Sequence, residues 1–266
     1  MTSNHVVEDN LAKVTQLMDT FEGETDLLML PENFAHMPRH EEERTACAEE
    51  MNDGPIQLFL SQFAKQHHCW LVAGSVPIRS DNQNGEDKIY QACLVYDDEG
   101  KLRQRYNKVH LFDVTLPNGE IYQESRYIEY GQIDQNPTVQ TPWGLIGLSV
   151  CYDVRFPEFY RSMPDEVFLV SVPAAFTKRS GEAHWHVLLK ARAIENQVYI
   201  AAPGQTGTHS NGRETWGHSM IIGPWGEVLQ ELPNQQGVIS THIDLNYVQE
   251  IREQFPCLQH KRTKTL

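Results

Sequence analysis

Positive charge is scarce in this sequence. Its 22 lysines and arginines stand against 36 aspartates and glutamates, so the formal net charge at pH 7 is −14. Proteins bind nucleic acids and anionic membrane surfaces through clusters of basic side chains. The charge balance therefore predicts that neither nucleic acid nor a membrane is a partner.

Long apolar runs are missing as well. No stretch approaches the roughly 18 consecutive apolar residues of a membrane-spanning helix. The amino-terminal segment MTSNHVVEDN has neither the basic start nor the apolar stretch of a secretory signal. We therefore expect a cytoplasmic protein.

Cysteine is sparse, and its five residues include no C-x-x-C pair. An odd number of scattered cysteines is typical of reduced thiols and argues against a disulfide framework or a cysteine-based zinc site. The five are Cys47, Cys69, Cys93, Cys151 and Cys257. A free thiol is thus available for chemistry.

Apolar side chains are sufficient for a substantial core. The 266 residues are 40% hydrophobic, and no linker or repeat divides them, so we expect one domain over residues 1–266. Helical spacing predicts helices over 9–20, 54–68 and 181–197. Apolar runs predict strands over 25–32, 69–78, 166–176 and 198–203, and hairpins over 89–106, 138–150 and 218–232. Because hairpins interrupt the alternation of strand and helix, we expect mixed sheets covered by helices.

Three polar residues stand out against this apolar background. Cys151 ends an apolar run in GLSVCYDVRFPEFYR, Glu32 follows Pro31 at the end of a strand, and Lys108 lies in the apolar segment YNKVHLF. Taken singly, they are most simply a buried thiol, a solvated strand end and a surface charge. Together they could supply a nucleophile, a base and a positive charge.

Three segments together resemble the signature motifs of the nitrilase superfamily of carbon–nitrogen hydrolases. They are LLMLPENF with Glu32, RYNKVHLFD with Lys108 and GLSVCYDVRFPEFYR with Cys151, in the family's order and at about its spacing. The resemblance covers nearly the whole chain and implies a four-layer αββα sandwich of two mixed β-sheets, assembled as a homodimer. It also implies that the first strand of this fold is missing, since a short apolar strand normally precedes the segment that begins here at Met1. A sheet edge would then be unpaired.

The same resemblance implies a triad of Glu32 as general base, Lys108 as stabiliser of the oxyanion and Cys151 as nucleophile. The segment YQESRYIEYG matches a further glutamate of the family, so Glu124 is expected to orient Lys108 or the substrate amide. The backbone N–H of Tyr152 is expected to help bind the oxyanion. No cofactor and no metal ion are implied.

The segments AHWHVLLKARAIENQ, AAPGQTGTH and GHSMIIGPWGEVL are most similar to the branch that hydrolyses deaminated glutathione. The implied reaction splits an amide carbon–nitrogen bond of a small-molecule substrate through a cysteine thioester and releases ammonia. Two alternatives stay open: an ω-amidase acting on α-ketoglutaramate or α-ketosuccinamate, and a non-catalytic binding module on the same fold. Nothing favours the second, because all three triad positions are intact.

Proton transfer within this triad needs help from its surroundings. An ordinary thiol pKa of about 8.5 and a glutamate pKa of about 4.3 leave a gap of roughly 5.7 kcal/mol. Burial raises the pKa of a carboxyl, and a nearby lysine lowers the pKa of a thiol. We therefore expect Lys108 to favour the thiolate of Cys151 first and to stabilise the oxyanion later.

Charged residues crowd the segment after the nucleophile. The four are Asp153, Arg155, Glu158 and Arg161. We expect them to form ion pairs and caps that fix the turn and a helix starting near Pro157, with binding of a substrate anion by Arg155 as the alternative. Four other basic residues are equally open as partners of the substrate carboxylates: Arg126, Lys178, Arg179 and Arg213.

A metallohydrolase is the main alternative from another class, because the chain has 12 histidines. His67–His68 and the HWH motif at 184–186 come closest to a metal-binding pattern. Residues i and i+2 of a helix do not face each other, however, and no H-E-x-x-H occurs. A papain-type protease is also disfavoured, since its C-G-S-C-W motif is absent.

Overall fold

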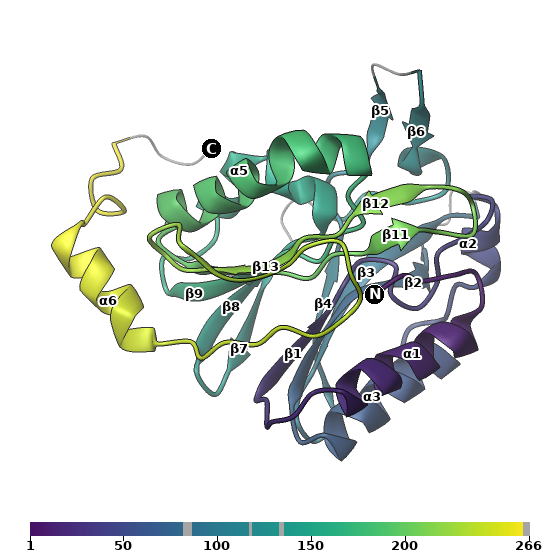
Figure 1. Cartoon of the computed structure of the whole chain (residues 1–266), viewed down its shortest axis with the longest axis horizontal. Coiled ribbons are helices and arrows are strands. Elements are labelled where there is room, and N and C mark those ends of the chain that lie inside the picture. Colours follow the sequence, from purple (N-terminus) through teal and green to yellow (C-terminus); the bar gives the residue numbers. More distant parts are fainter. Residues whose placement is uncertain (82–86, 117–118, 133–135, 263–266) are drawn as a thin grey trace.

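Two β-sheets face each other in this chain, and helices cover the outer side of each sheet (Figure 1). This arrangement comes from a computed structural model that describes residues 1–81, 87–116, 119–132 and 136–262. The layers run helix, sheet, sheet, helix, and both sheets are mixed. The αββα sandwich implied by the family resemblance is thereby confirmed.

The first sheet has four strands in the order β1-β2-β3-β4. β1 runs parallel to β2, and the other neighbours are antiparallel. The strands are β1 (Leu27–Leu30), β2 (Trp70–Arg79), β3 (Ile89–Tyr96) and β4 (Leu102–Asn107). Among the described residues, β1 pairs with no strand other than β2.

Both faces of β2 are buried. Leu71 packs with the layer of α1 (Val7–Asp19) and α3 (Pro55–Gln66), whereas the next residue, Val72, packs against the second sheet. Successive side chains of a strand point to opposite faces, so a strand buried on both sides reads as one continuous apolar run. Both helices begin and end within two residues of the predicted ranges.

The second sheet has six strands in the order β14-β13-β10-β9-β8-β7. Its central strands β8, β9 and β10 are parallel, and the outer pairs are the antiparallel hairpins β7–β8 and β13–β14. The strands are β7 (Thr138–Thr141), β8 (Gly144–Leu148), β9 (Val167–Ser171), β10 (Tyr199–Ala202), β13 (Ser219–Ile222) and β14 (Val228–Leu232). Each hairpin turns at Pro-Trp-Gly, as predicted.

The long helix α5 (Lys178–Asn196) covers the outer face of the second sheet (Figure 1). Its buried face includes Trp185 and Leu189, which belong to the same apolar cluster as the strands beneath them. The remaining elements are short, apart from α6 near the carboxyl end. They are α2 (Glu43–Ala46), β5 (Asp113–Thr115), β6 (Ile121–Gln123), η1 (Glu124–Arg126), η2 (Cys151–Arg155), α4 (Pro157–Arg161), β11 (Thr206–Thr208), β12 (Glu214–Trp216) and α6 (Leu245–Gln254).

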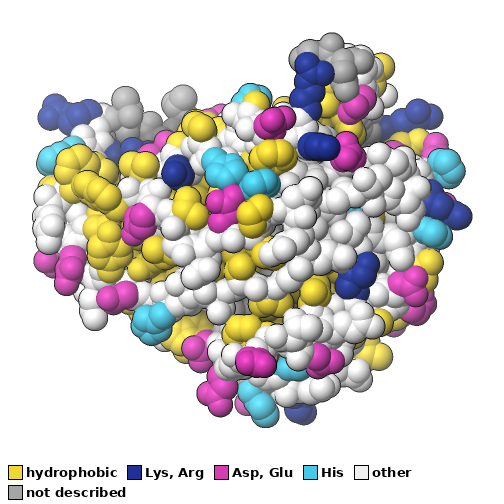
Figure 2. Space-filling model, viewed as in Figure 1, with side chains coloured by type: hydrophobic (Ala, Val, Ile, Leu, Met, Phe, Trp, Pro, Cys, Tyr) yellow, Lys and Arg dark blue, Asp and Glu magenta, His cyan; other side chains and the backbone are white. Residues whose placement is uncertain are grey.

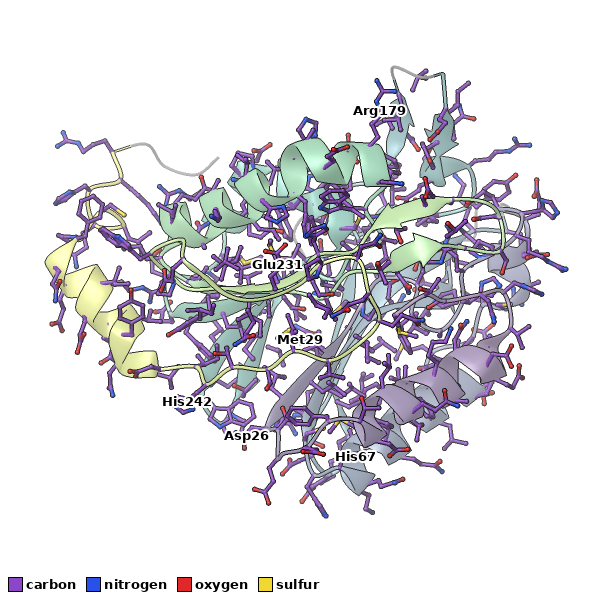
Figure 3. The ribbon with its side chains drawn as sticks, viewed as in Figure 1. Asp26, Met29, His67, Arg179, Glu231 and His242 are labelled. Atoms are coloured by element: carbon purple, nitrogen blue, oxygen red, sulfur yellow. The ribbon has the colours of Figure 1, made fainter. Side chains whose placement is uncertain are left out.

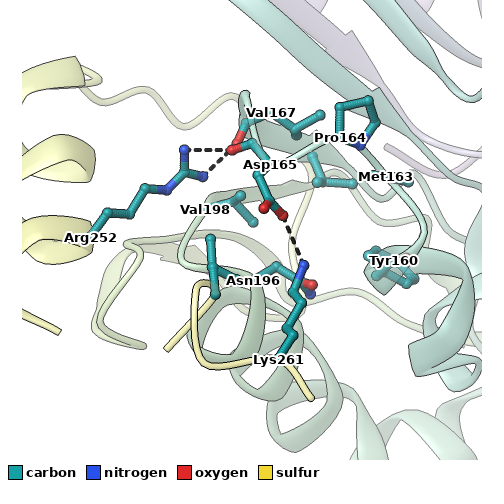
Figure 4. Close-up of a pocket in the computed structure, with 11 residues that line it drawn as sticks. Tyr160, Met163, Pro164, Asp165, Val167, Asn196, Val198, Arg252 and Lys261 are labelled. Atoms are coloured by element: carbon teal, nitrogen blue, oxygen red, sulfur yellow. Dashed lines mark hydrogen bonds and ion pairs between the residues drawn. The ribbon is translucent and has the colours of Figure 1, made fainter. Parts of the chain in front are cut away.

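The carboxyl-terminal segment closes one pocket of the molecule (Figure 4). Arg252 of α6 donates to the backbone oxygens of Asp165 and Val167, and Lys261 forms an ion pair with Asp165 at 2.8 Å. No candidate catalytic residue lines this pocket. Within the described part of the chain, no helix is long and apolar enough to cross a membrane.

Candidate active site

β1 brings Glu32 into the interior of the sandwich. Pro31 follows the last residue of the strand, and the side chain of Glu32 is only 3% exposed. Gly74 of β2 lies directly against this strand end: a Cβ there would stand 2.3 Å from backbone atoms of Leu30 and Pro31. Only glycine permits this approach, so the packing of β1 on β2 fixes the position of Glu32.

Lys108 comes directly after β4, and its side chain is completely buried. Its Nζ lies 2.9 Å from Oε1 of Glu32 and 2.8 Å from Oε2 of Glu124, the first residue of η1. Buried charges are tolerated when they are paired and hydrogen-bonded. One ammonium group therefore holds two carboxylates together.

Backbone N–H groups complete the hydrogen bonding of both carboxylates. The N–H of Ala175 donates to Oε2 of Glu32 at 2.9 Å, and the N–H of Phe112 donates to Oε2 of Glu124 at 2.8 Å. Neither donor could be predicted from the sequence, because backbone groups carry no residue-specific pattern. In Glu32 the two donors bind different oxygens, whereas in Glu124 Lys108 and the N–H of Phe112 share Oε2.

Cys151 begins η2, three residues beyond the end of β8. Its φ is 48°, in the left-handed region that non-glycine residues rarely adopt, and its N–H donates to Pro173 O at 2.8 Å. The N–H groups of Val150 and Asp153 also have acceptors, whereas that of Tyr152 has none within the described residues. The turn after the cysteine thus leaves one backbone donor free beside the thiol.

The two carboxylates and the thiol line one pocket of about 270 Å³. Aromatic rings and a single basic residue form much of the rest of its wall: Phe112, Tyr152, Phe176 and Arg213. Lys108 lies behind the carboxylates it binds. The structure therefore brings together Glu32, Lys108, Glu124 and Cys151, which the sequence places on four separate segments.

The charges of this cluster shift the pKa values of its members in different directions. For Lys108, burial lowers the pKa, but Glu124 and Glu32 outweigh burial and raise it above the ordinary value. For Glu124, burial raises the pKa, but Lys108 and the N–H of Phe112 outweigh it and hold the pKa below the ordinary value. Both groups are therefore charged at neutral pH.

The thiol behaves differently from the expectation. Burial and the charge of Glu32 raise the pKa of Cys151 well above that of an ordinary thiol, and the opposing effect of Lys108 is smaller. Lys108 by itself lowers the pKa of Cys151, as predicted. The predicted thiolate is nevertheless wrong, because the net pKa is raised. Two carboxylates compete with one ammonium, so Cys151 rests as a neutral thiol.

The raised pKa of Cys151 predicts slow alkylation at neutral pH. Only thiolate reacts with iodoacetamide, so the rate at Cys151 is expected to keep rising above about pH 9.5, where that of an ordinary thiol of pKa about 8.5 levels off. Peptide mass spectrometry after timed labelling from pH 7 to 10 measures this profile. The pH at which the rate levels off reports the pKa of the thiol, whereas the absolute rate also reports how readily the reagent reaches it. A rate at Cys151 that levels off near pH 7 would contradict the assignment.

Hydrogen bonds hold the charged segment after Cys151, residues 153–161. Its charged side chains form no ion pairs with one another within the described residues. Asp153 is fully buried and accepts from the hydroxyl of Tyr106, the N–H of His110 and the N–H of Val150. The predicted cap is confirmed for Asp153, and α4 begins at Pro157 as expected, but the predicted ion-pair network is wrong.

Of the basic residues left open as carboxylate partners, only Arg213 lines the pocket. Its Nη2 donates to Ala175 O at 2.5 Å, and its buried Nε has no partner within the described residues. Lys178 instead pairs with Glu214, and Arg179 lies at the exposed start of α5 (Figure 3). Arg155 lies over the rings of Tyr152 and Phe176, and Arg126 over the ring of Tyr127.

Known proteins share this fold and sequence over nearly the whole of this chain. The profile of the carbon–nitrogen hydrolase family matches residues 3–253. A deaminated glutathione amidase of Yersinia enterocolitica is 38% identical over 267 residues, which cover 98% of this chain and 91% of that protein. Two solved structures are also similar.

The C. elegans NitFhit protein superposes with a TM-score of 0.89 at 35% identity; the match covers 98% of this chain and 63% of NitFhit, so this chain spans less than two thirds of that protein. Saccharomyces cerevisiae Nit3, a member of branch 10 of the nitrilase superfamily, superposes with a TM-score of 0.86 at 27% identity, over 98% of this chain and 93% of Nit3. The chain therefore belongs to the carbon–nitrogen hydrolase family and is an amide hydrolase.

Proposed function

We propose that this chain hydrolyses an amide bond of deaminated glutathione, with Cys151 as nucleophile, Glu32 as general base and Lys108 as oxyanion stabiliser. The expected release of ammonia does not apply to this substrate: both of its nitrogens lie in peptide bonds, so the leaving group is an amine. The observation that carries the chemistry is the meeting of a thiol and two carboxylates, bridged by one ammonium, at a single pocket. The printed activity of the Yersinia enterocolitica relative supports the substrate. We further propose a single domain over residues 1–266, a homodimer and a cytoplasmic location.

The proton of the neutral thiol passes to Glu32 as Sγ attacks the amide carbon, because a free thiolate is unfavourable in this pocket. The carbonyl oxygen takes up negative charge, which the N–H of Tyr152 and the ammonium of Lys108 stabilise. The carbon–nitrogen bond then breaks, and Glu32 returns the proton so that the amine leaves. Glu124 keeps Lys108 in position throughout.

Water completes the cycle. Glu32 accepts a proton from a water molecule as the water oxygen attacks the thioester carbon, and the carbon–sulfur bond breaks. Glu32 passes this proton to the sulfur of Cys151. The product leaves as a carboxylate, and its own acid proton goes to solvent. Each step uses the same two oxygens of Glu32, which Ala175 N–H and Lys108 hold in fixed orientation.

A substrate panel tests the assignment. Hydrolysis of deaminated glutathione, measured as release of its amine product, is expected to exceed ammonia release from α-ketoglutaramate and from glutamine by at least about tenfold in kcat/KM, since one charged contact is worth that much. Preference for α-ketoglutaramate would assign an ω-amidase instead. Equal rates on all three would indicate a broad amidase, and no release from any would favour a binding module.

Arg213 is proposed to bind a substrate carboxylate, because its guanidinium lines the pocket and one of its buried N–H groups has no acceptor within the described residues. Replacing Arg213 by methionine is expected to raise KM for deaminated glutathione about 10- to 100-fold, the value of a charge-assisted hydrogen bond, with kcat changing less. Steady-state kinetics measure both constants. Lys178→Met, outside the pocket, is the matched control, and an unchanged KM in Arg213→Met would contradict the role.

A further inference from the structure

A second cluster of reactive side chains lies outside the proposed active site. Nε2 of His186 lies 3.0 Å and Nδ1 of His218 lies 2.6 Å from the same oxygen, Oε1 of Glu231. All three ligand atoms lie within 4.8 Å of one another. None of these residues lines the pocket of Cys151.

Three separate elements build this cluster. His186 is on α5, Glu231 is on β14, and His218 lies between β12 and β13. On the face drawn in Figure 2, histidine side chains (cyan) adjoin acidic side chains (magenta) in the upper centre, and Figure 3 labels Glu231 on the same face. A bridge between these side chains would tie α5 to the edge hairpin of the second sheet.

His218 is held firmly in place. Its N–H donates to Pro233 O at 2.7 Å, and its carbonyl accepts from Trp185 Nε1 at 2.9 Å. Its ring stacks on Trp216 with centroids 4.2 Å apart and planes 16° apart. A ligand whose backbone and ring are both fixed loses little entropy when it binds an ion.

The cluster is open enough to take an ion from solution. The side chains of His186, His218 and Glu231 are 35%, 18% and 30% exposed. Imidazole nitrogens and a carboxylate oxygen are the ligands that zinc and its first-row neighbours prefer. Zinc lies about 2.0–2.2 Å from such atoms, so its ligands stand roughly 3.3 Å apart, and the observed separations need only a small opening.

We propose that His186, His218 and Glu231 bind one divalent transition-metal ion, with zinc as the representative ion and solvent in the remaining coordination position. The ion replaces the protons that now lie between the two imidazoles and the shared carboxylate oxygen. The bound ion thereby links α5 to β14. This inference is independent of the substrate and of the roles proposed for Cys151, Glu32 and Lys108.

His184 supplies a matched control on the same helix. It is exposed, and its Nδ1 lies 3.2 Å from Nη1 of Arg155 rather than near the cluster. The spacing argument against His184 and His186 as a ligand pair therefore holds. Local spacing could not reveal the partners of His186, because His218 and Glu231 lie 32 and 45 positions further along the chain.

Zinc titration of the untagged, chelator-stripped chain tests the proposal. We expect one equivalent of zinc to bind in competition with a chromophoric chelator, and the melting temperature to rise by roughly 2–4 °C. His186→Gln and Glu231→Gln are each expected to weaken binding at least tenfold, whereas His184→Gln binds as the parent does. Repeating the titration with Cys151→Ala removes the pocket thiol as a competing ligand.

Two results would overturn the proposal. One is the absence of saturable zinc binding to the parent chain, which would leave the cluster as a hydrogen-bonded network. The other is parent-like binding by both His186→Gln and Glu231→Gln, which would place the ion elsewhere. Because all of these variants are judged by stoichiometry, affinity and melting temperature, failure of the proposed amidase activity would not affect the outcome.

Discussion

Replacing the proposed nucleophile Cys151 by alanine is expected to abolish hydrolysis of deaminated glutathione, with a loss of at least about 10⁴-fold in kcat, the loss typical of covalent nucleophiles. No other described thiol lines the pocket, so nothing can take its place. Alanine removes one sulfur atom from a buried position and keeps the backbone, so the fold is expected to survive with a loss of about 1 kcal/mol. An assay of the released amine together with a melting curve measures both effects.

The half-buried Cys47 is the matched control for this change, since it lies outside the pocket. Cys47→Ala is expected to keep parental activity and to block alkylation only at residue 47. Turnover by Cys151→Ala within about tenfold of the parent would remove the thioester route altogether. Loss of structure in Cys151→Ala, seen as a missing melting transition, would instead show that the thiol has a packing role.

Replacing Lys108 by methionine is expected to damage both activity and stability. The ammonium bridges Glu32 and Glu124 in a fully buried position, and its removal leaves two carboxylates facing each other without a counter-charge. Breaking a buried ion pair from one side costs about 3–5 kcal/mol of unfolding free energy. Loss of the oxyanion partner is expected to lower kcat by roughly 10²- to 10³-fold as well. Urea unfolding and steady-state kinetics measure the two losses.

The pKa shifts of Glu124 and Lys108 predict how the free energy of unfolding changes with pH. The folded pKa of Glu124 is lowered, so its contribution to stability is present above about pH 4.3 and is lost as the pH falls through the folded pKa. The folded pKa of Lys108 is raised, so its contribution is present below about pH 10.4 and is lost as the pH rises further. The parent chain should therefore lose stability toward both extremes.

In Lys108→Met, the change of stability between pH 7 and pH 5 is expected to have the opposite sign to that of the parent. Its unpaired carboxylates are destabilising when charged, so the variant is expected to gain stability as the pH falls from 7 toward 5. The double variant Lys108→Met, Glu124→Gln is the matched control, because one fewer carboxylate should restore part of the stability but none of the activity. A single variant as stable as the parent at pH 7 would show that the bridge contributes little.

The sequence predicted mixed sheets covered by helices because its periodicities are strong, and the family resemblance implied the four layers. Two buried faces make β2 a mostly apolar run, and Pro-Trp-Gly marks both hairpins of the second sheet. Glu32 and Cys151 each follow an apolar run and Lys108 lies inside one, but it was the family motifs that selected all three. Their meeting at one pocket is a structural fact, while their roles stay predictions.

What the sequence could not predict depends on contacts between distant segments. Asp153 is satisfied by Tyr106 and His110, which are 47 and 43 residues away, so local charges gave the wrong partners. The net pKa shift of Cys151 depends on how deeply the thiol lies and on how many carboxylates surround it. Neither quantity is encoded in a motif. The same reason hid the cluster of His186, His218 and Glu231.

The backbone of Cys151 has a consequence for engineering. A non-glycine residue at φ 48° costs on the order of 1 kcal/mol or more, so a procedure that optimised the chain for thermostability alone would favour glycine at 151. That choice would remove the sulfur. Any consensus or computational redesign of this chain therefore has to hold residue 151 constant, and the stability it forgoes there must be recovered at positions far from the pocket.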